Sequence, residues 1–224
     1  MDFSEECSGV FPETDSRQIE KAADLLRSGG VVAFPTETGY GLGASVFRET
    51  GRFNNKGLEK IYAIKQRPSH KPLLVLADSI DMLGMVSDHA LEGVAALLVS
   101  KFWPGPLTLL FRSAPGLPWP LCGDTGKVGV RISSHPWATA LVRAVGFPVT
   151  ATSANLSGMD MALAPADVER QLVSPAPDMI LDAGVISGGL PSTIVDCAMS
   201  PPVLVRRGMI DRTRLVMAGV ECGQ

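Results

Sequence analysis

Residues 31–43 read Val-Val-Ala-Phe-Pro-Thr-Glu-Thr-Gly-Tyr-Gly-Leu-Gly. The apolar start of this stretch predicts a short buried strand over Val31–Phe34. Hydroxyl and carboxylate side chains follow at once, and then three glycines within five residues. Because glycine lets a backbone approach a ligand closely, the stretch predicts a strand that ends at a binding loop. A tight loop or a glycine-kinked strand without a ligand is the alternative, and the spacing matches neither a Walker A nor a dinucleotide-binding loop.

Helical and strand patterns alternate on both sides of this stretch. Apolar periodicity predicts helices over residues 17–28, 58–65, 89–101, 136–145 and 168–173. Short apolar runs predict strands over residues 31–34, 73–77, 107–111, 128–132, 148–152, 179–182, 193–196 and 203–206. We therefore expect one α/β domain around a large mixed sheet. It spans residues 17–211, between an N-terminal extension over 1–16 and a C-terminal tail over 212–224.

The composition excludes several classes of protein. Of the 224 residues, 46% are hydrophobic and 19% charged, which excludes global disorder. The net charge of −3 excludes a general nucleic-acid polycation but leaves room for a local basic patch. Four scattered cysteines and three histidines form no Cys-x-x-Cys or His-Glu-x-x-His motif, so no metal site built by the protein is expected. The sequence shows no signal-peptide pattern and no apolar run of membrane-spanning length, so we expect a cytoplasmic protein without membrane contact.

A cluster of positive charge lies between Arg52 and Lys71. This segment holds six lysine or arginine residues against the single carboxylate of Glu59. A solvated helix face is the usual explanation of such a run. The functional alternative is a phosphate clamp in which Lys65 and Arg67 lie on the loop that ends a helix. Spacing alone does not decide between the two.

Polar residues also interrupt or follow the apolar strands. Arg131 lies within Val-Gly-Val-Arg-Ile and needs a partner, either a carboxylate of the protein or a carboxylate of a small substrate. Arg206 ends the strand over 203–206 in the same manner. Ser153 and Asn155 follow another apolar strand, where they either make local turns or bind phosphate oxygens or a cation.

Taken in order, these segments resemble the YrdC/TsaC family. The residues that carry the resemblance are the run from Phe34 to Ala44, Lys65-x-Arg67-Pro68, Trp103 to Thr108, Val130-Arg131 with His135-Pro136, Ser153-x-Asn155 with Ser157-Gly158, and Ser192-Thr193-Ile194. The resemblance covers roughly residues 17–211 and implies the single-domain form of the family. It also implies the family's twisted mixed sheet flanked by helices, with a concave, positively charged cavity.

Members of that family are L-threonylcarbamoyladenylate synthases, which combine L-threonine, bicarbonate and ATP and release pyrophosphate. The resemblance implies that L-threonine is bound by Thr36, Arg131, Ala151 and Ser192. It implies that ATP is bound, together with the Mg²⁺ it carries, by Lys65, Arg67, Lys71, Ser153, Asn155 and Arg206. The product would pass to a threonylcarbamoyl-transferase complex that modifies adenosine 37 of tRNA, with RNA contact as a further expectation.

The sequence departs from the family's usual pattern at three positions. Gly39 lies where the family commonly has valine, Leu76 where some relatives have a polar residue, and Met161 where a small polar residue often follows Ser-Gly. A non-catalytic module of the same fold that binds double-stranded RNA is the alternative function. Its binding would fall steeply with salt.

Overall fold

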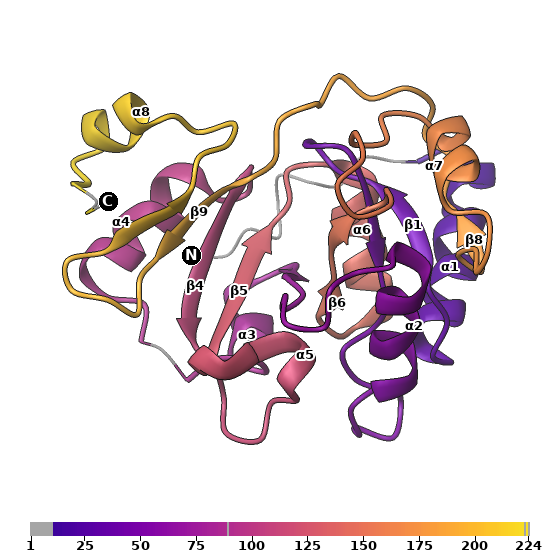
Figure 1. The fold of residues 1–224 in the computed structure, drawn as a ribbon, viewed down its shortest axis with the longest axis horizontal. Coiled ribbons are helices and arrows are strands. Elements are labelled where there is room, and N and C mark those ends of the chain that lie inside the picture. The colour runs from indigo at the N-terminus through magenta and orange to yellow at the C-terminus, as the bar shows by residue number, and fades with distance from the viewer. Residues whose placement is uncertain (1–10, 89, 222, 224) are drawn as a thin grey trace.

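The computed structural model describes residues 11–88, 90–221 and 223 of the chain (Figure 1). Most of the predicted N-terminal extension and the predicted helix start at His89 lie outside these residues. The helices are α1 (Glu13–Arg27), α2 (Asn55–Lys65), α3 (Ile80–Leu83), α4 (Gly93–Phe102), α5 (Trp119–Cys122), α6 (Pro136–Val145), α7 (Pro165–Gln171) and α8 (Arg212–Met217), with a 3-10 turn over Gly123–Thr125.

The strands are β1 (Val32–Pro35), β2 (Tyr40–Gly43), β3 (Val75–Ala77), β4 (Leu107–Arg112), β5 (Lys127–Ile132), β6 (Val149–Thr150), β7 (Thr152–Ser153), β8 (Met179–Ile180), β9 (Thr193–Asp196) and β10 (Val203–Arg206). The predicted α/β class with mixed strand pairing and flanking helices is confirmed. The strands, however, form two sheets rather than one large sheet, in the orders β7-β2-β1-β8 and β10-β9-β4-β5-β3-β6.

The chain changes sheets at Ala151, which explains this difference. Residues 148–152, predicted as one strand, form β6 in the larger sheet and β7 in the smaller one. The Ala151 amide donates to the Leu74 carbonyl at 2.8 Å, and the Thr150 amide donates to the Ala44 carbonyl at 2.8 Å. The two sheets therefore meet along this short segment.

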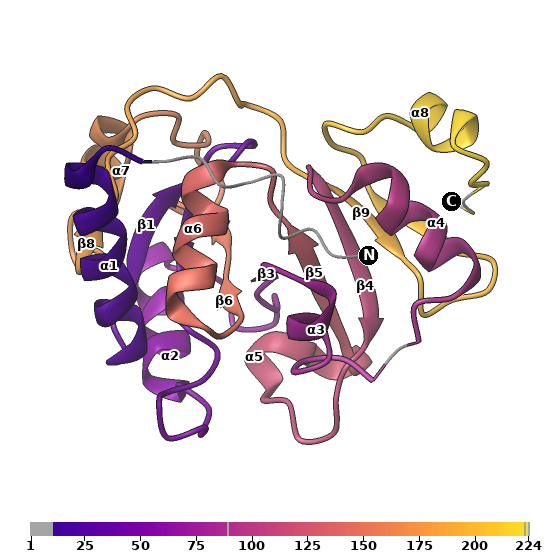
Figure 2. The same cartoon turned by 180° about the vertical axis from the view of Figure 1, so that it is seen from behind.

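In the smaller sheet, β1 pairs antiparallel with β2 and parallel with β8. Helices α1 and α6 pack side by side against it, with the buried residues Ile19, Ala22, Ala23 and Leu26 of α1 facing inward (Figure 2). In the larger sheet, β5 pairs antiparallel with β4 and parallel with β3. Helices α4 and α8 lie at the β9–β10 end of this sheet (Figure 1).

The bounds of α6, β9 and β10 match the prediction residue for residue. Helix α1 begins at Glu13 rather than Arg17, and Pro12 is its N-cap residue. The alternative of a glycine-kinked strand is right for Tyr40–Gly43, which forms β2.

The patterns missed the short helices α3, α5 and α8. Helix α8 falls in the segment predicted as a tail, where Leu215 and Val220 are buried. No helix in the described part of the chain has the length and apolar character needed to cross a bilayer.

Candidate functional site

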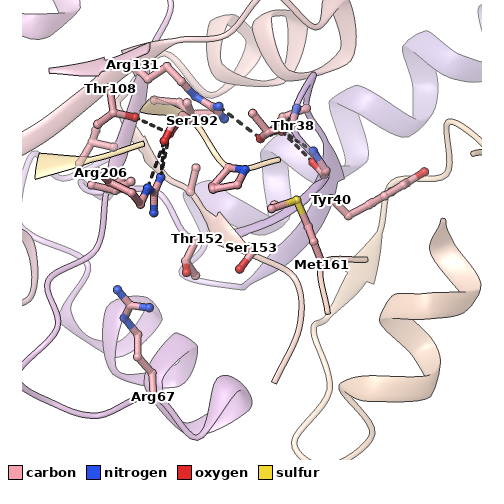
Figure 3. Close-up of a pocket in the computed structure, with 18 residues that line it drawn as sticks. Thr38, Tyr40, Arg67, Thr108, Arg131, Thr152, Ser153, Met161, Ser192 and Arg206 are labelled. Carbon is pink, nitrogen blue, oxygen red and sulfur yellow. Dashed lines mark hydrogen bonds between the residues drawn. The ribbon is translucent and has the colours of Figure 1, made fainter. Parts of the chain in front are cut away.

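A cavity of about 150 Å³ lies where the two sheets face each other (Figure 3). It is lined by Thr36, Thr38, Gly39, Tyr40, Gly41, Arg67, Leu74, Val75, Leu76, Thr108, Arg131, Ala151, Thr152, Ser153, Met161, Pro191, Ser192 and Arg206. A cavity of about this size admits a molecule as large as benzene. Its enclosed part therefore suits a ligand the size of an amino acid, and a nucleotide would extend beyond it.

The smaller sheet contributes main chain and small polar side chains to the cavity. The turn between β1 and β2 is closed by the Thr36 amide, which donates to the Gly39 carbonyl at 3.0 Å. The Thr36 hydroxyl donates to the same carbonyl at 2.7 Å and lies 2.9 Å from the Thr38 hydroxyl. These bonds hold both threonines at the cavity wall, where Figure 3 shows Thr38 facing the Arg131 guanidinium.

The glycines of β2 serve packing as well as the cavity. A Cβ at Gly43 would overlap the Thr150 carbonyl oxygen, so glycine is required where the hairpin meets the seam between the sheets. Gly41 lines the cavity, and a Cβ there would lie in ordinary contact with the Phe34 ring. Residues 36–39 therefore form a turn that lines the cavity, and Gly41 and Gly43 belong to the strand β2.

The larger sheet contributes positive charge and hydroxyls. Arg206, at the end of β10, donates from Nε and Nη2 to the Ser192 carbonyl at 3.0 and 2.9 Å, and from Nη2 to the Ser192 hydroxyl at 3.0 Å. The Ser192 hydroxyl lies 2.8 Å from the Thr108 hydroxyl of β4. Ser192, just before β9, is thereby bonded to residues of β4 and β10, the two strands that flank β9.

Arg131 of β5 is paired with a carboxylate of the protein itself. This was one of the two partners that the sequence allowed. Its Nη1 lies 3.5 Å from Glu37 Oε1 and donates to the Thr38 hydroxyl at 3.3 Å. Their side chains are 8% and 14% exposed, and the other Glu37 oxygen accepts from the Ser133 hydroxyl. Burial lowers the pKa of Arg131, and the nearby Glu37 opposes that shift. Arg131 also lines the cavity, so an ion pair within the protein and contact with a ligand are compatible.

Arg67, two residues after the end of α2, completes a group of three arginines in the cavity. Its Nε donates to the Lys71 carbonyl at 3.1 Å and its Nη2 to the Pro72 carbonyl at 2.9 Å. Burial lowers the pKa of Arg206, and the charges of Arg131 and Arg67 lower it further. Among the described residues that line the cavity, none carries a carboxylate. The three guanidiniums therefore repel one another around a space that favours an anion.

Lys65 lies behind the cavity wall rather than on a loop. It is the last residue of α2, its side chain is buried, and Nζ donates to the carbonyl oxygens of Ser153 and, at 2.6 Å, of Asn155. Burial lowers the pKa of Lys65 to about 7, with a smaller contribution from Arg67. The prediction that Lys65 lies on the loop after the helix is therefore wrong: Lys65 ends α2, and its amino group anchors the Ser153–Gly158 loop.

Asn155 also supports that loop from within. Its amide nitrogen donates to the Leu156 and Met159 carbonyls at 3.0 and 2.6 Å, and its side-chain oxygen lies 3.4 Å from Lys65 Nζ. Ser153 lines the cavity, but Asn155 and Lys65 do not.

Lys71 is exposed outside the cavity, and its backbone carbonyl accepts from Arg67 and Tyr62. Within the described part of the chain, no group of three or more histidine, cysteine, aspartate or glutamate side chains is placed to hold a metal ion. The predicted site residues thus fall into three groups. Seven line the cavity, Lys65 and Asn155 are buried and support the Ser153–Gly158 loop, and Lys71 is exposed.

Sequence reasoning missed several lining residues as parts of the site, among them Thr38, Tyr40, Thr108 and Met161. Alternation of hydroxyls in Thr36-Glu37-Thr38 was a usable signal for Thr38. Tyr40 and Thr108 lie within strand patterns whose facing side depends on the sheet arrangement. Nothing in the local pattern at Met161 indicates a cavity residue.

The sequence and fold of the chain resemble those of several known proteins. The family model for Sua5, YciO and YrdC proteins, described as "Telomere recombination", matches residues 24–208. Threonylcarbamoyl-AMP synthase of Bacillus subtilis (strain 168) is 39% identical over 203 residues, covering 90% of this chain and 56% of that protein. Threonylcarbamoyl-AMP synthase of Psychromonas ingrahamii is 34% identical over 179 residues, covering 79% of this chain and 91% of that protein.

The crystal structure of Pyrococcus abyssi Sua5 complexed with L-threonine has a TM-score of 0.84 and 32% sequence identity to this chain. The match covers 92% of this chain and 59% of that one, so the chain spans little more than half the length of Sua5 and of the B. subtilis relative. Because the family model covers most of the chain, and a relative above 30% identity is covered almost completely, the chain belongs to the Sua5/YciO/YrdC family.

Proposed function

We propose that this chain makes threonylcarbamoyl-AMP and pyrophosphate from L-threonine, bicarbonate and ATP. The observation that carries the proposal is the convergence of Arg67, Arg131 and Arg206 on one cavity whose described lining has no carboxylate. Such a site fits a reaction in which anionic substrates must be brought together. The names of the curated relatives and the L-threonine complex of Sua5 support the same activity.

The proposed chemistry needs positioning more than it needs a nucleophilic side chain. The amine of L-threonine attacks the carbon of bicarbonate and water is lost, which leaves a carbamate. A carbamate oxygen then bonds to the α-phosphorus of ATP while the bond from that phosphorus to the β-phosphate bridging oxygen breaks. Pyrophosphate carries away the bonding pair. Fixed guanidiniums stabilise the charge that develops on the phosphate oxygens.

We assign L-threonine to the enclosed part of the cavity, with Thr36, Arg131, Ala151 and Ser192 as its contacts. Arg131 would pair with the substrate carboxylate through the face it does not turn to Glu37. The hydroxyls of Thr36 and Ser192 would bind the polar groups of the amino acid. The main chain at Ala151, at the seam of the two sheets, would close one side.

We assign ATP to the open side of the cavity, where Arg67, Ser153 and Arg206 would contact the phosphates. Lys65 and Asn155 belong to the proposed ATP site as supports of the Ser153–Gly158 loop. The proposed set also includes Lys71, whose exposed side chain would reach only the part of the triphosphate outside the cavity.

The Mg²⁺ that accompanies ATP fits this site as an ion carried by the triphosphate. The Ser153 hydroxyl is a neutral oxygen donor at the cavity, and Mg²⁺ commonly keeps several waters while bound through substrate phosphates. When bound, it would reduce the negative charge on the triphosphate. Ser153 would orient it, and the arginines would hold the remaining phosphate charge.

We further propose that residues 17–211 form the catalytic unit, with flanking segments over 1–16 and 212–224. The product would pass to a threonylcarbamoyl-transferase complex that acts on adenosine 37 of tRNA, with RNA contact by this chain as part of the transfer. ATP and tRNA as reactants favour the cytoplasm as the place of the reaction.

The test is pyrophosphate release by the purified chain with ATP, Mg²⁺ and bicarbonate, with and without L-threonine. We expect release that depends on both L-threonine and bicarbonate, and a product with the mass of threonylcarbamoyl-AMP. L-Serine and L-valine serve as alternative substrates. Pyrophosphate release at the same rate with and without L-threonine, from protein shown to be folded, would contradict the proposal.

A further inference from the structure

Met161 occupies the space that the missing side chain of Gly39 leaves open at the cavity wall. A Cβ built on Gly39 would overlap Met161 Sδ and lie 2.6 Å from Met161 Cγ. Both residues line the cavity, and Figure 3 shows the Met161 side chain lying between Tyr40 and Ser153. The two positions, 122 residues apart in sequence, therefore share one volume.

The main chain holds these two residues in register. The Tyr40 amide donates to the Ala162 carbonyl at 2.9 Å, which fixes the segment after Met161 against the start of β2. The Thr36 amide and hydroxyl both donate to the Gly39 carbonyl. Gly39 does not lie in the left-handed region of φ, so its backbone accepts an L-residue without strain. A side chain at Gly39 would chiefly disturb Met161 and would also lie 3.3 Å from the Ala162 carbonyl oxygen.

We propose that Met161 is a specificity-determining residue whose thioether side chain sets the size of the amino-acid part of the cavity. This inference rests on the proposed function and adds to it a residue that limits the length of the substrate's side chain. The other side chains around that part are either hydrogen-bonded, as for Thr36 and Ser192, or packed in the sheets, as for Val75 and Leu76. Met161 is only partly buried and lies in a loop between β7 and α7, so a substitution there can move this part of the wall without disturbing a sheet.

The Met161 side chain would select among amino-acid substrates by the volume of their side chains. One added methylene on a ligand changes its preference for an apolar pocket by about 10–200-fold. Methionine is flexible and adapts to irregular space, which puts the expected discrimination at the lower end of that range. Removing the side chain beyond Cβ opens room for that extra methylene, while the polar contacts to the amino and carboxyl groups stay in place.

The first experiment compares L-threonine with its homologue (2S,3R)-2-amino-3-hydroxypentanoate, which carries one more methylene. Dissociation constants are measured by titration calorimetry on the full chain. We expect the wild-type chain to prefer L-threonine by about tenfold or more, and Met161→Ala to reduce this preference by about tenfold. Met159→Ala is the matched control, because Met159 is 60% exposed and does not line the cavity. An unchanged preference in Met161→Ala would overturn the proposal.

The second experiment tests whether Gly39 and Met161 share the volume. Gly39→Ala alone pushes the Met161 side chain toward the cavity, so L-threonine binding should weaken by about tenfold or more. Adding Met161→Ala should restore most of that loss, a non-additive result that only neighbours in contact give. Additive losses in the double variant, with melting temperatures showing that all three variants are folded, would overturn the shared-volume claim.

Failure of this inference is distinguishable from failure of the proposed function. Without threonine-dependent pyrophosphate release by the wild-type chain, the function and the inference fall together. With release intact and the ligand preference unchanged in Met161→Ala, only the inference falls.

Discussion

The two walls of the cavity are built on different principles. The smaller sheet presents main chain, hydroxyls and glycines, with Thr36, Thr38 and Gly41 close to the open space. The larger sheet presents Arg131 on the largely buried strand β5 and Arg206 at the end of the partly exposed strand β10. One wall therefore fixes shape through backbone hydrogen bonds. The other supplies charge, with Arg131 held by the Glu37 carboxylate and the Thr38 hydroxyl and Arg206 held by the Ser192 carbonyl and hydroxyl.

The same contrast separates two neighbouring cations of one short motif. Lys65 is buried and bonded to main-chain oxygens of the loop behind the smaller sheet. Arg67, two residues later, lines the cavity. Charge type and sequence spacing do not distinguish them, but burial does: Lys65 stabilises a loop and Arg67 is available to a ligand.

Removing Lys65 is the largest expected effect on the fold. Lys65→Ala should lower the free energy of unfolding by about 4 kcal/mol, because it leaves a cavity and strips the Ser153 and Asn155 carbonyls of a donor. Urea denaturation measures the loss. A Lys65→Ala chain as stable as the wild type would mean that the ammonium group does not anchor the loop. The difference in role between Lys65 and Arg67 would then be refuted.

Arg131 should carry both structural and ligand-binding roles. Arg131→Ala leaves Glu37 without its cation and should lower the free energy of unfolding by about 3 kcal/mol. Glu37→Gln in the same chain removes the unpaired charge and should recover at least half of that loss. L-Threonine affinity should not recover with it. If Glu37→Gln restored both the free energy of unfolding and the affinity for L-threonine, Arg131 would serve only the ion pair.

Arg67 should affect catalysis with little effect on the fold. Arg67→Ala should lower kcat/KM for ATP by about 10²-fold, since a guanidinium fixed at a developing phosphate charge contributes about 2.7 kcal/mol or more. Arg52→Ala is the matched control and should change kcat/KM by about twofold at most, because Arg52 is exposed and does not line the cavity. Equal losses in the two variants would contradict the geometry.

The pH dependence of stability gives the smallest and finest test. The pKa of Lys65 is lowered to about 7 in the folded chain, against about 10.4 for a free lysine. Between these values the unfolded chain binds more protons, so this group makes unfolding less favourable as pH rises. From pH 7 to 8.5 the wild-type chain should gain about 1–2 kcal/mol relative to Lys65→Met. Parallel pH curves for the two chains would contradict the lowered pKa.

Local patterns predicted much of the fold because single segments carry their own signals. Helix α6 follows from its apolar period and the proline at its start, and β9 and β10 follow from short apolar runs. The division into two sheets was not predictable in this way. It depends on where Thr150 and Ala151 find backbone partners in other segments, which local periodicity does not encode.

The candidate site was predictable in its residues and less so in its geometry. The arginines stood out because a charge in an apolar strand needs a partner, but the choice of Glu37 as the partner of Arg131 needed the fold. The burial of Lys65 needed the position of the Ser153–Gly158 loop. Met161 had no local signal, since its role arises from the glycine on a distant hairpin.

The most direct test of the two-walled cavity is a pair of KM values measured in two variants. Threonine-dependent pyrophosphate release is followed in Arg131→Ala/Glu37→Gln and in Arg67→Ala, because Arg67 bonds to none of the proposed L-threonine contacts. The account predicts that the first variant raises KM for L-threonine with little change for ATP, and that the second raises KM for ATP with little change for L-threonine. A rise of both KM values by the same factor in both variants would show that the arginines form one undivided anion site, contrary to the account.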